Sequence, residues 1–336
     1  MLEGVGHQEC VSYANIIASY VAGIAGQCSC AILSGGIDTT FIVLTHPRRS
    51  QLRVVTVDLG GDDLVYASLV ASKLGIRSHT VLRPTEEELL GAVDWVLGNL
   101  KTIDPIEVSA DAVHYLTSIW ALGSGCDCLL SGDGGDEVFL GYTFLEGKSL
   151  EEIVAWHRSM LVGAWLPTVH VGALVGVRVL APLYSQPIRD IAGSLPLNCM
   201  LIRGVGGKIL LRLYIESQGL REVAWRRKTP VNTGSGSLEA LKRIAGRVQI
   251  GEEALENVNR TMGFNPPTPL HRFLAYRMVE LGVEPPGVVE DGCPLCGRAI
   301  HRSSCKFCGS YVTPQGYILH YSQQYTMEVT IRNREI

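Results

Sequence analysis

The chain has 336 residues, and this length predicts two domains, or one large domain with an appendage. Hydrophobic residues make up 46% of the sequence and charged residues 18%, so a large core is expected and a wholly disordered chain is excluded. The formal charge of −4 provides no overall basic surface, so nucleic acid is not favoured as a partner. The first ten residues lack the pattern expected of a signal peptide, and Pro167 and His170 interrupt the least polar stretch, 160–177. We therefore expect a cytoplasmic protein without a membrane span.

Apolar runs and helical patterns alternate along the first half of the chain. Residues 11–25 have the spacing of an amphipathic helix, as do 64–74 and 86–97. The short apolar runs expected as strands, each followed by a turn, are 31–33, 54–57 and 128–130. This alternation predicts an α/β fold with a doubly wound parallel sheet, in which ligands bind at the carboxyl ends of the strands.

The sequence of the second half of the chain indicates a different organisation. Residues 149–282 have helical patterns with Gly and Pro interruptions, and Pro285-Pro286-Gly287 is typical of a linker. We therefore expect a large domain at 1–287 with a helical C-terminal part, and a small zinc ribbon with a tail at 288–336. The tail ends in a strand-like run, 327–331.

The first candidate site is the turn after the run 31–33, which reads Ser34-Gly35-Gly36-Ile37-Asp38-Thr39. Glycines let backbone N–H groups converge on an anion, and the helix that follows directs the positive end of its dipole to the same place. The turn lacks the Gly-Lys-Ser/Thr of the Walker loop, so Asp38 fits as a ligand of a Mg²⁺ that bridges to phosphates. The alternative is a strand–helix turn that simply requires glycine.

A second turn follows the run 128–130 and reads Ser131-Gly132-Asp133-Gly134-Gly135-Asp136-Glu137. Three carboxylates within five residues repel one another unless cations compensate. The two turns together predict an ATP–Mg²⁺ site at one edge of the sheet. The alternative for the second turn is an acidic loop exposed to solvent.

Four of the ten cysteines lie close together, as two C-x-x-C pairs: Cys293, Cys296, Cys305 and Cys308. Each pair is followed by a glycine, and two such turns supply the tetrahedral four-thiolate site that Zn²⁺ accepts. A closed site of this kind is structural rather than catalytic. Two disulfides or an iron centre are the alternatives.

The other six cysteines are interpreted as core thiols. Cys28 and Cys30 lie at the amino end of one expected strand and Cys126 and Cys128 at that of another, so both pairs lie at the edge opposite the turns. Small buried thiols are favoured there over a second metal or redox site.

The chain resembles the synthetase domain of asparagine synthetases and their relatives, including β-lactam synthetase, within the ATP pyrophosphatases. The segment 34–39 is similar to the family's Ser-Gly-Gly-x-Asp-Ser, and 131–142 to its Ser-Gly-(Glu/Asp)-Gly-(Ser/Gly)-Asp-Glu-x-Phe-x-Gly-Tyr. Residues 67–79 are similar to Ala-x-x-Val-Ala-x-x-Leu-Gly-x-x-x-His, 208–212 to Lys-x-x-Leu-Arg, and 226–234 to Arg-x-Lys-x-x-x-x-x-Gly. Five matches in order are far more specific than any one of them.

The resemblance implies an adenine nucleotide alpha-hydrolase-like fold and an AMP-forming carbon–nitrogen ligase. Such enzymes adenylate a carboxylate with ATP, release pyrophosphate, and let ammonia displace AMP. The residues that the resemblance assigns to nucleotide binding are Ser34, Gly35, Gly36, Asp38, Thr39, Asp58, Gly132 and Asp136. It further implies that Asp38 and Asp136 bind Mg²⁺ and that Lys208 and Lys228 neutralise charge on pyrophosphate or the transition state. Asp133, where asparagine synthetases carry Glu, would take a proton from the attacking ammonium or amine.

The substrates follow less directly. Leu180 stands where the family has Arg, so the acceptor carboxylate stays open, with the aspartate side chain as first candidate. The first turn begins after only 33 residues, so we expect no glutaminase domain here and a nitrogen supply from ammonia, a separate glutaminase or another amine. The zinc ribbon suggests a macromolecular partner.

Two other functions are kept as alternatives. A tRNA-modifying ATP pyrophosphatase of the thiolation type also joins this nucleotide fold to a zinc ribbon. A non-catalytic scaffold would bind ATP without turnover. Pyrophosphate release stimulated by ammonia and aspartate favours the ligase, whereas release stimulated by tRNA favours the first alternative.

Overall fold

The computed structural model describes residues 5–301, 303–312 and 318–320; the strand-like run at 327–331 lies outside them. The chain forms two compact units. The first comprises Met1–Arg83 and His114–Ser235, and the second comprises Pro84–Val113 and the chain from Gly236 onward. The expected boundary at residue 287 stays a prediction.

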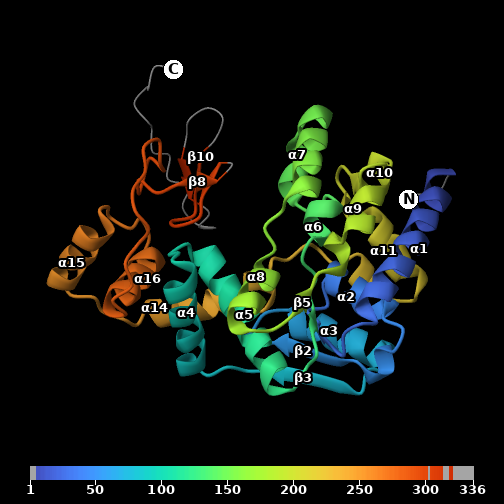
Figure 1. Ribbon diagram of the computed structural model, residues 1–336, viewed down its shortest axis with the longest axis horizontal. Coiled ribbons are helices and arrows are strands. Elements are labelled where there is room, and N and C mark those ends of the chain that lie inside the picture. The colour runs from blue at the N-terminus through green and yellow to red at the C-terminus, as the bar shows by residue number, and fades with distance from the viewer. Residues whose placement is uncertain (1–4, 302, 313–317, 321–336) are drawn as a thin grey trace. The chain divides into compact units, whose positions relative to one another are not determined.

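A five-stranded parallel sheet forms the centre of the first unit (Figure 1). Its order is β3-β2-β1-β4-β5, so β1 lies in the middle and the chain runs outward to β3 before returning to β4 on the other side. This arrangement confirms the doubly wound α/β fold. The strands are β1 Cys30–Ile32, β2 Arg53–Val57, β3 Ser78–Leu82, β4 Leu129–Leu130 and β5 Val179–Leu180.

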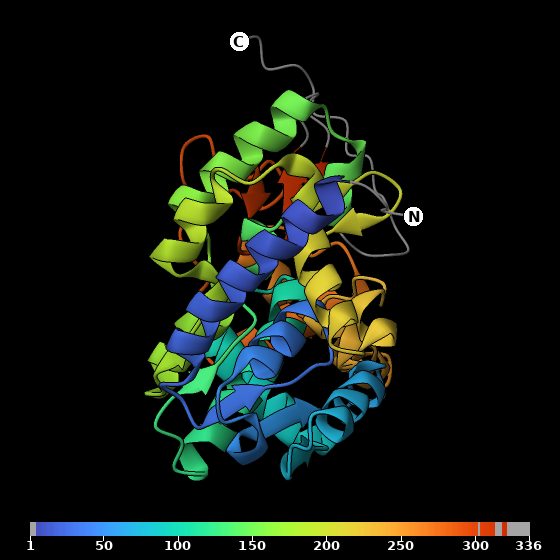
Figure 2. The ribbon, with the colours of Figure 1, turned by 90° about the vertical axis from the view of Figure 1, so that its right-hand side faces the viewer.

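Helices cover both faces of this sheet, because each face carries apolar side chains that must be buried. On one face, α1 (Val5–Ala25), α2 (Ile37–Thr45) and α11 (Ile209–Ser217) pack against one another and share a large core with α3 (Asp63–Lys73). Figure 2 shows α1 in dark blue across the outer side of this layer. On the other face, Ala121 and Val169 pack with Leu129 and Val179 in a smaller core.

The remaining elements of the first unit are short. A two-stranded antiparallel sheet consists of β6 (Leu201–Ile202) and β7 (Gly206–Gly207). The α-helices are α6 Gly135–Val138, α7 Leu150–Val162, α8 Pro167–Val175, α9 Gln186–Ala192, α10 Leu197–Met200, α12 Arg221–Ala224 and α13 Val231–Gly234. The 3₁₀ helices are η1 Arg49–Gln51, η2 Thr143–Gly147 and η3 Pro182–Tyr184.

The second unit is helical and carries a small antiparallel sheet of order β11-β10-β9-β8. Its helix α16 packs against α4, α14 and α15. The start of α4 has a capping box, since Thr85 and Glu88 each accept a hydrogen bond from the other's backbone N–H. The elements are α4 Glu86–Leu100, the first half of α5 (Pro105–Gly123), α14 Ser237–Ala245, α15 Glu252–Met262, α16 Pro269–Glu280, β8 Ile300–His301, β9 Ser304–Cys305, β10 Ser310–Val312 and β11 Ile318–His320.

Six cysteines of the first unit form three disulfides, so the interpretation of these residues as free thiols is wrong. The pairs are Cys10–Cys199, Cys28–Cys128 and Cys30–Cys126, with Cα atoms 5.1, 5.1 and 5.9 Å apart. The last two pairs arise because β1 and β4 are neighbours, which places Cys28 and Cys30, at the start of β1, beside the residues that lead into β4. These sulfurs are therefore not available to a second metal site.

The stretch 160–177 contains parts of two helices, α7 and α8, joined by a loop. Among the described residues, no helix has both the length and the apolar character that crossing a membrane requires.

Candidate active site

The two glycine-rich turns touch each other because they follow neighbouring parallel strands. Ala31 of β1 pairs with Leu130 of β4, and each chain then leaves the sheet at the same edge. A Cβ on Gly132 would lie 3.0 Å from the Cβ of Asp38, and one on Gly135 would lie 2.2 Å from its Oδ1. The backbone of the second turn therefore lies directly against Asp38, and a side chain at Gly135 would collide with the Asp38 carboxylate.

Two lysines bind the carboxylates of the turns. Lys208 Nζ lies 2.5 Å from Asp38 Oδ2 and 2.7 Å from Asp136 Oδ1, and Lys228 Nζ lies 2.5 Å from Asp136 Oδ2. Lys208 is only 3% exposed, so its ammonium group is shielded from solvent and pairs with these two carboxylates. The structure thus brings together four of the residues that the sequence analysis selected.

The electrostatics of this group follow from burial and charge. Burial raises the pKa of Asp38, with Lys208 acting in the opposite sense. Burial also favours the neutral form of Asp136, but Lys208 and Lys228 together outweigh it and hold the pKa of Asp136 far below its usual range. Burial would lower the pKa of Lys208, yet the two carboxylates raise it, so this lysine is charged.

The first turn is fixed by its own hydroxyl groups and by its packing against α3. The hydroxyls of Ser34 and Thr39 lie 3.1 Å apart, and Gly36 N–H donates to Ser34 Oγ over 3.2 Å. No side chain caps the N-terminus of α2. Gly35 has φ +66°, and a Cβ there would lie 2.5 Å from the backbone nitrogen of Ala67 in α3, so only glycine fits.

Asp133 holds the start of α8. Its Oδ2 accepts hydrogen bonds from the N–H groups of Thr168 and Val169 at 2.9 and 3.2 Å, and its Oδ1 accepts one from Thr168 Oγ1 at 2.8 Å. The residue before α8, Leu166, has no side chain able to cap it. Burial raises the pKa of Asp133 despite these bonds. Both oxygens are thus engaged by a helix terminus.

Glu137 is a further acid at this site. Tyr142 donates a hydrogen bond to its Oε1 over 2.5 Å, and burial, followed by the negative charge of Asp136, raises the pKa of Glu137 to about 7. A Cβ on Gly141 would lie 2.1 Å from Asp136 Oδ1, so this glycine leaves room for the carboxylate.

Arg226 has no role in the sequence analysis, although the motif around Lys228 contains it. The structure buries its guanidinium, which donates to Ser34 O over 3.1 Å and pairs with Asp63 Oδ1 at 2.8 Å. It also lies 4.2 Å over the ring of Tyr66. Arg226 therefore fixes the first turn to α3, and its place two residues before Lys228 was the available signal.

Asp58 lies apart from this group of charges in its contacts. Its Oδ2 pairs with Arg83 Nε at 3.0 Å, and its Oδ1 accepts a hydrogen bond from Gly60 N–H.

The donor set fits Mg²⁺. Asp38 Oδ1 is buried and accepts no hydrogen bond from any residue that the structure describes. A buried carboxylate oxygen without a partner costs free energy, and carboxylates are the ligands that Mg²⁺ prefers. Asp38 and Asp136, which share Lys208, are the residues that would hold the ion.

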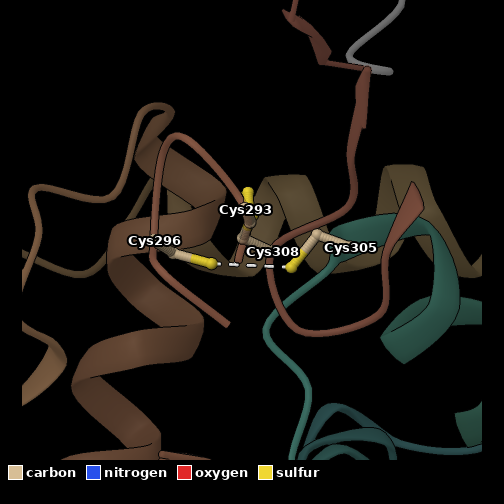
Figure 3. A group of neighbouring side chains, drawn as sticks. All are labelled: Cys293, Cys296, Cys305 and Cys308. Carbon is tan, nitrogen blue, oxygen red and sulfur yellow. Dashed lines mark hydrogen bonds between the residues drawn. The ribbon is translucent and has the colours of Figure 1, made fainter. Parts of the chain in front are cut away.

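A second group of chemically active side chains lies in the second unit. The Sγ atoms of Cys293, Cys296, Cys305 and Cys308 all lie within 4.8 Å of one another, and all four residues are buried. Figure 3 shows their side chains gathered between the two turns that carry them. Among the described residues, no other group of His, Cys, Asp and Glu has this arrangement.

The fold and the site together define a class of protein. It is an α/β protein in which a glycine-rich turn and a turn rich in carboxylates lie at the same edge of a parallel sheet. Residues 25–168 match the family model for asparagine synthase. The matched segment includes both glycine-rich turns and agrees with the resemblance stated above.

Individual relatives extend the similarity beyond that segment. The chain is 28% identical over 309 residues to asparagine synthetase B [glutamine-hydrolyzing] of Escherichia coli (strain K12), which covers 82% of this chain and 53% of the relative. It is 25% identical over 278 residues to asparagine synthetase [glutamine-hydrolyzing] 2 of Lotus japonicus, with 74% and 46% covered. The chain spans about half the length of the curated relatives it matches.

Proposed function

We propose that this protein is an ATP-dependent, AMP-forming ligase that makes an amide from a carboxylate and a nitrogen donor. The observation that carries the proposal is the meeting of Asp38, Asp136, Lys208 and Lys228 beside the Ser34–Thr39 turn. Two carboxylates for a metal ion, two cations and a glycine-rich turn beside an uncapped helix N-terminus are groups suited to nucleotidyl transfer.

Each residue has a defined task in this proposal. The turn amides and the N-terminus of α2 bind the pyrophosphate part of ATP, with Thr39 beside them. Asp38 and Asp136 would hold Mg²⁺, which would supply positive charge to the phosphates. Lys208 and Lys228 exchange part of their contact with the carboxylates for contact with the leaving pyrophosphate. Gly132, which has no side chain, leaves space for the pyrophosphate beside Asp38.

The substrates belong to the same proposal. The aspartate side chain is the first candidate for the acceptor, and ammonia, free or from a separate glutaminase, for the nitrogen donor. The names of the relatives call those proteins glutamine-hydrolyzing. Proton removal by Asp133 and a nucleotide contact of Asp58 stay predictions. We also propose that the four-cysteine site holds Zn²⁺, while a macromolecular partner of this region stays a prediction.

Exchange of labelled pyrophosphate into ATP tests the proposal. With Mg²⁺ and a panel of carboxylates, the protein should catalyse exchange that depends on the acceptor, and ammonium should convert the signal into net AMP. Asp136→Asn should abolish exchange, whereas Glu151→Gln, an exposed change on α7, should leave it intact. Pyrophosphate release that requires tRNA, or ATP binding without any turnover, would contradict the ligase.

A further inference from the structure

The four cysteines have the spacing of a metal site rather than of disulfides. The Sγ atoms of Cys293 and Cys308 lie 3.7 Å apart, and those of Cys296 and Cys305 lie 3.5 Å apart. A tetrahedral ion with Zn–S bonds of about 2.3 Å places its sulfurs about 3.8 Å from one another. A disulfide requires about 2.05 Å.

The second cysteine turn is bonded to the segment before α5. Thr102 Oγ1 donates to the carbonyl of Lys306 over 2.7 Å, and Ile103 N–H donates to the carbonyl of Phe307 over 2.8 Å. Both carbonyls lie between Cys305 and Cys308, so these bonds fix the backbone that presents two of the four ligands. Thr102 and Ile103 are buried.

Helix α16 holds the same turn from another side. His271 Nε2 lies 3.0 Å from the carbonyl oxygen of Cys308, and because a carbonyl only accepts, Nε2 donates. The His271 ring is oriented by Thr268, whose hydroxyl lies 2.7 Å from Nδ1. Helix α16 also buries Phe273 and Leu274 in contact with the rest of its unit. The ligand turn is thus connected to the core of the second unit.

A buried cation adjoins the first cysteine turn. Arg298 is 5% exposed, donates to the carbonyl of Cys296 over 2.6 Å, and lies 4.7 Å over the ring of Phe307. Four thiolates around a divalent ion leave a net charge of −2, which a buried guanidinium partly neutralises. The negative charge of the metal centre therefore accounts for the burial of the Arg298 guanidinium against an aromatic ring.

We propose that the four-cysteine centre is an integral part of the second unit, in which a tetrahedral divalent ion such as Zn²⁺ orders the segment 101–105 and α16 through the turn 305–308. In this arrangement Thr102, His271 and Arg298 are positioning residues for the metal. Metal binding and the ordering of α16 are thermodynamically linked. If the bound metal stabilises the ordered form of α16, the ordered form of α16 binds the metal more tightly by the same factor. The proposal does not depend on the ligase activity.

Hydrogen exchange on the full chain tests this proposal. Purified protein should contain one zinc per chain, and its four cysteines should resist alkylation until a chelator is added. Chelation should then increase amide exchange in peptides covering 101–108 and 269–280 as well as 293–308, while a peptide covering 37–57 of the first unit keeps its protection. A change confined to 288–312 would overturn the proposal, as would native protein that retains no metal.

Two threonine variants sharpen the test. Thr102→Val removes the hydroxyl that binds Lys306 O, and we expect zinc affinity, measured by competition with a chromophoric chelator, to fall about 10-fold or more. The control Thr85→Val removes an N-cap hydroxyl from α4 in the same unit and should leave zinc affinity unchanged. Equal affinities in the two variants would contradict the coupling, and the chelation experiment on unchanged protein remains decisive if either variant misfolds.

Discussion

Asp38 and Asp136 are two buried carboxylates that share one cation, Lys208. Lys208 satisfies one oxygen of each carboxylate, yet Asp38 Oδ1 stays buried without a hydrogen bond from the described residues. An ion that binds this oxygen recovers the cost of its burial. This gain in free energy supports the proposal that Asp38 is a ligand of Mg²⁺.

The close approach of Gly135 to Asp38 gives a first prediction. In Gly135→Ala the new methyl would overlap Asp38 Oδ1, so the carboxylate must move. A displacement of about 1 Å at a reacting centre costs about 100-fold in rate, and we expect pyrophosphate exchange to fall by at least that factor. Gly147→Ala is the control, since no atom lies within 4 Å of its Cβ position. Similar losses in both variants would contradict the contact.

Glu137 gives a prediction about pH. Its pKa is about 7 in the folded protein against an ordinary 4.5, so the folded protein holds this proton more tightly than the unfolded chain. Glu137 therefore stabilises the fold in acid, and this contribution is lost as the pH rises from about 4.5 through 7. Glu137→Gln should reduce the dependence of the free energy of unfolding on pH in that interval, measured without Mg²⁺ or nucleotide. Glu151→Gln should not, and equal pH profiles for the two variants would count against a protonated Glu137.

Sequence motifs selected the charged residues of this site but not their contacts. Asp38, Asp136 and the lysines lie in short patterns that are visible locally. The bond between Lys208 and Asp38 spans 170 residues, and Arg226 reaches Ser34 over 192, so these contacts depend on how the whole unit folds. Proton transfer by Asp133 was inferred from the position of this residue in a motif. Its hydrogen bonds come from Thr168 and Val169 in α8, which lies outside the motif and could not be predicted from it.

At the scale of elements, apolar runs predicted β1, β2 and β4 because these strands are buried. The outer strands β3 and β5 were not predicted. The first reads Ser-His-Thr-Val-Leu and is largely half-buried, and the second has only two residues, so neither forms a continuous apolar run. Their place in the sheet comes from pairing with β2 and β4, which is a tertiary effect.

Helix α8 gives a prediction at this scale, because Asp133 caps it from a distant turn. In Asp133→Ala no side-chain oxygen remains to accept from the N–H groups of Thr168 and Val169. We expect faster amide exchange in 167–175 and a loss of about 1–3 kcal/mol in the free energy of unfolding. Thr168→Val removes only the hydroxyl bond and should lose less. Unchanged exchange in α8, together with an altered pH profile of amide formation, would instead favour proton transfer by Asp133.

At the scale of the whole molecule, the cysteines divide between the units. The first unit contains three disulfides, and the second contains four cysteines suited to a metal. The two C-x-C pairs at the starts of neighbouring strands were a usable signal for disulfides, but the lack of a secretory pattern favoured thiols. The partners Cys10 and Cys199 lie 189 residues apart, and no local pattern joins them.

That disulfide supports the last prediction. It joins α1 to α10 and links residues that are 189 positions apart in the sequence, so its removal increases the conformational entropy of the unfolded chain. Cys10→Ala with Cys199→Ala should lower the free energy of unfolding of the first unit by about 2–5 kcal/mol. Thermal unfolding without reductant measures the change, and added reductant should lower the midpoint of the unchanged protein more than that of the variant. Alkylation provides the independent check: three disulfides leave four reactive cysteines in denatured, chelated, unreduced protein, whereas ten reactive cysteines would mean that the first unit is held by packing alone.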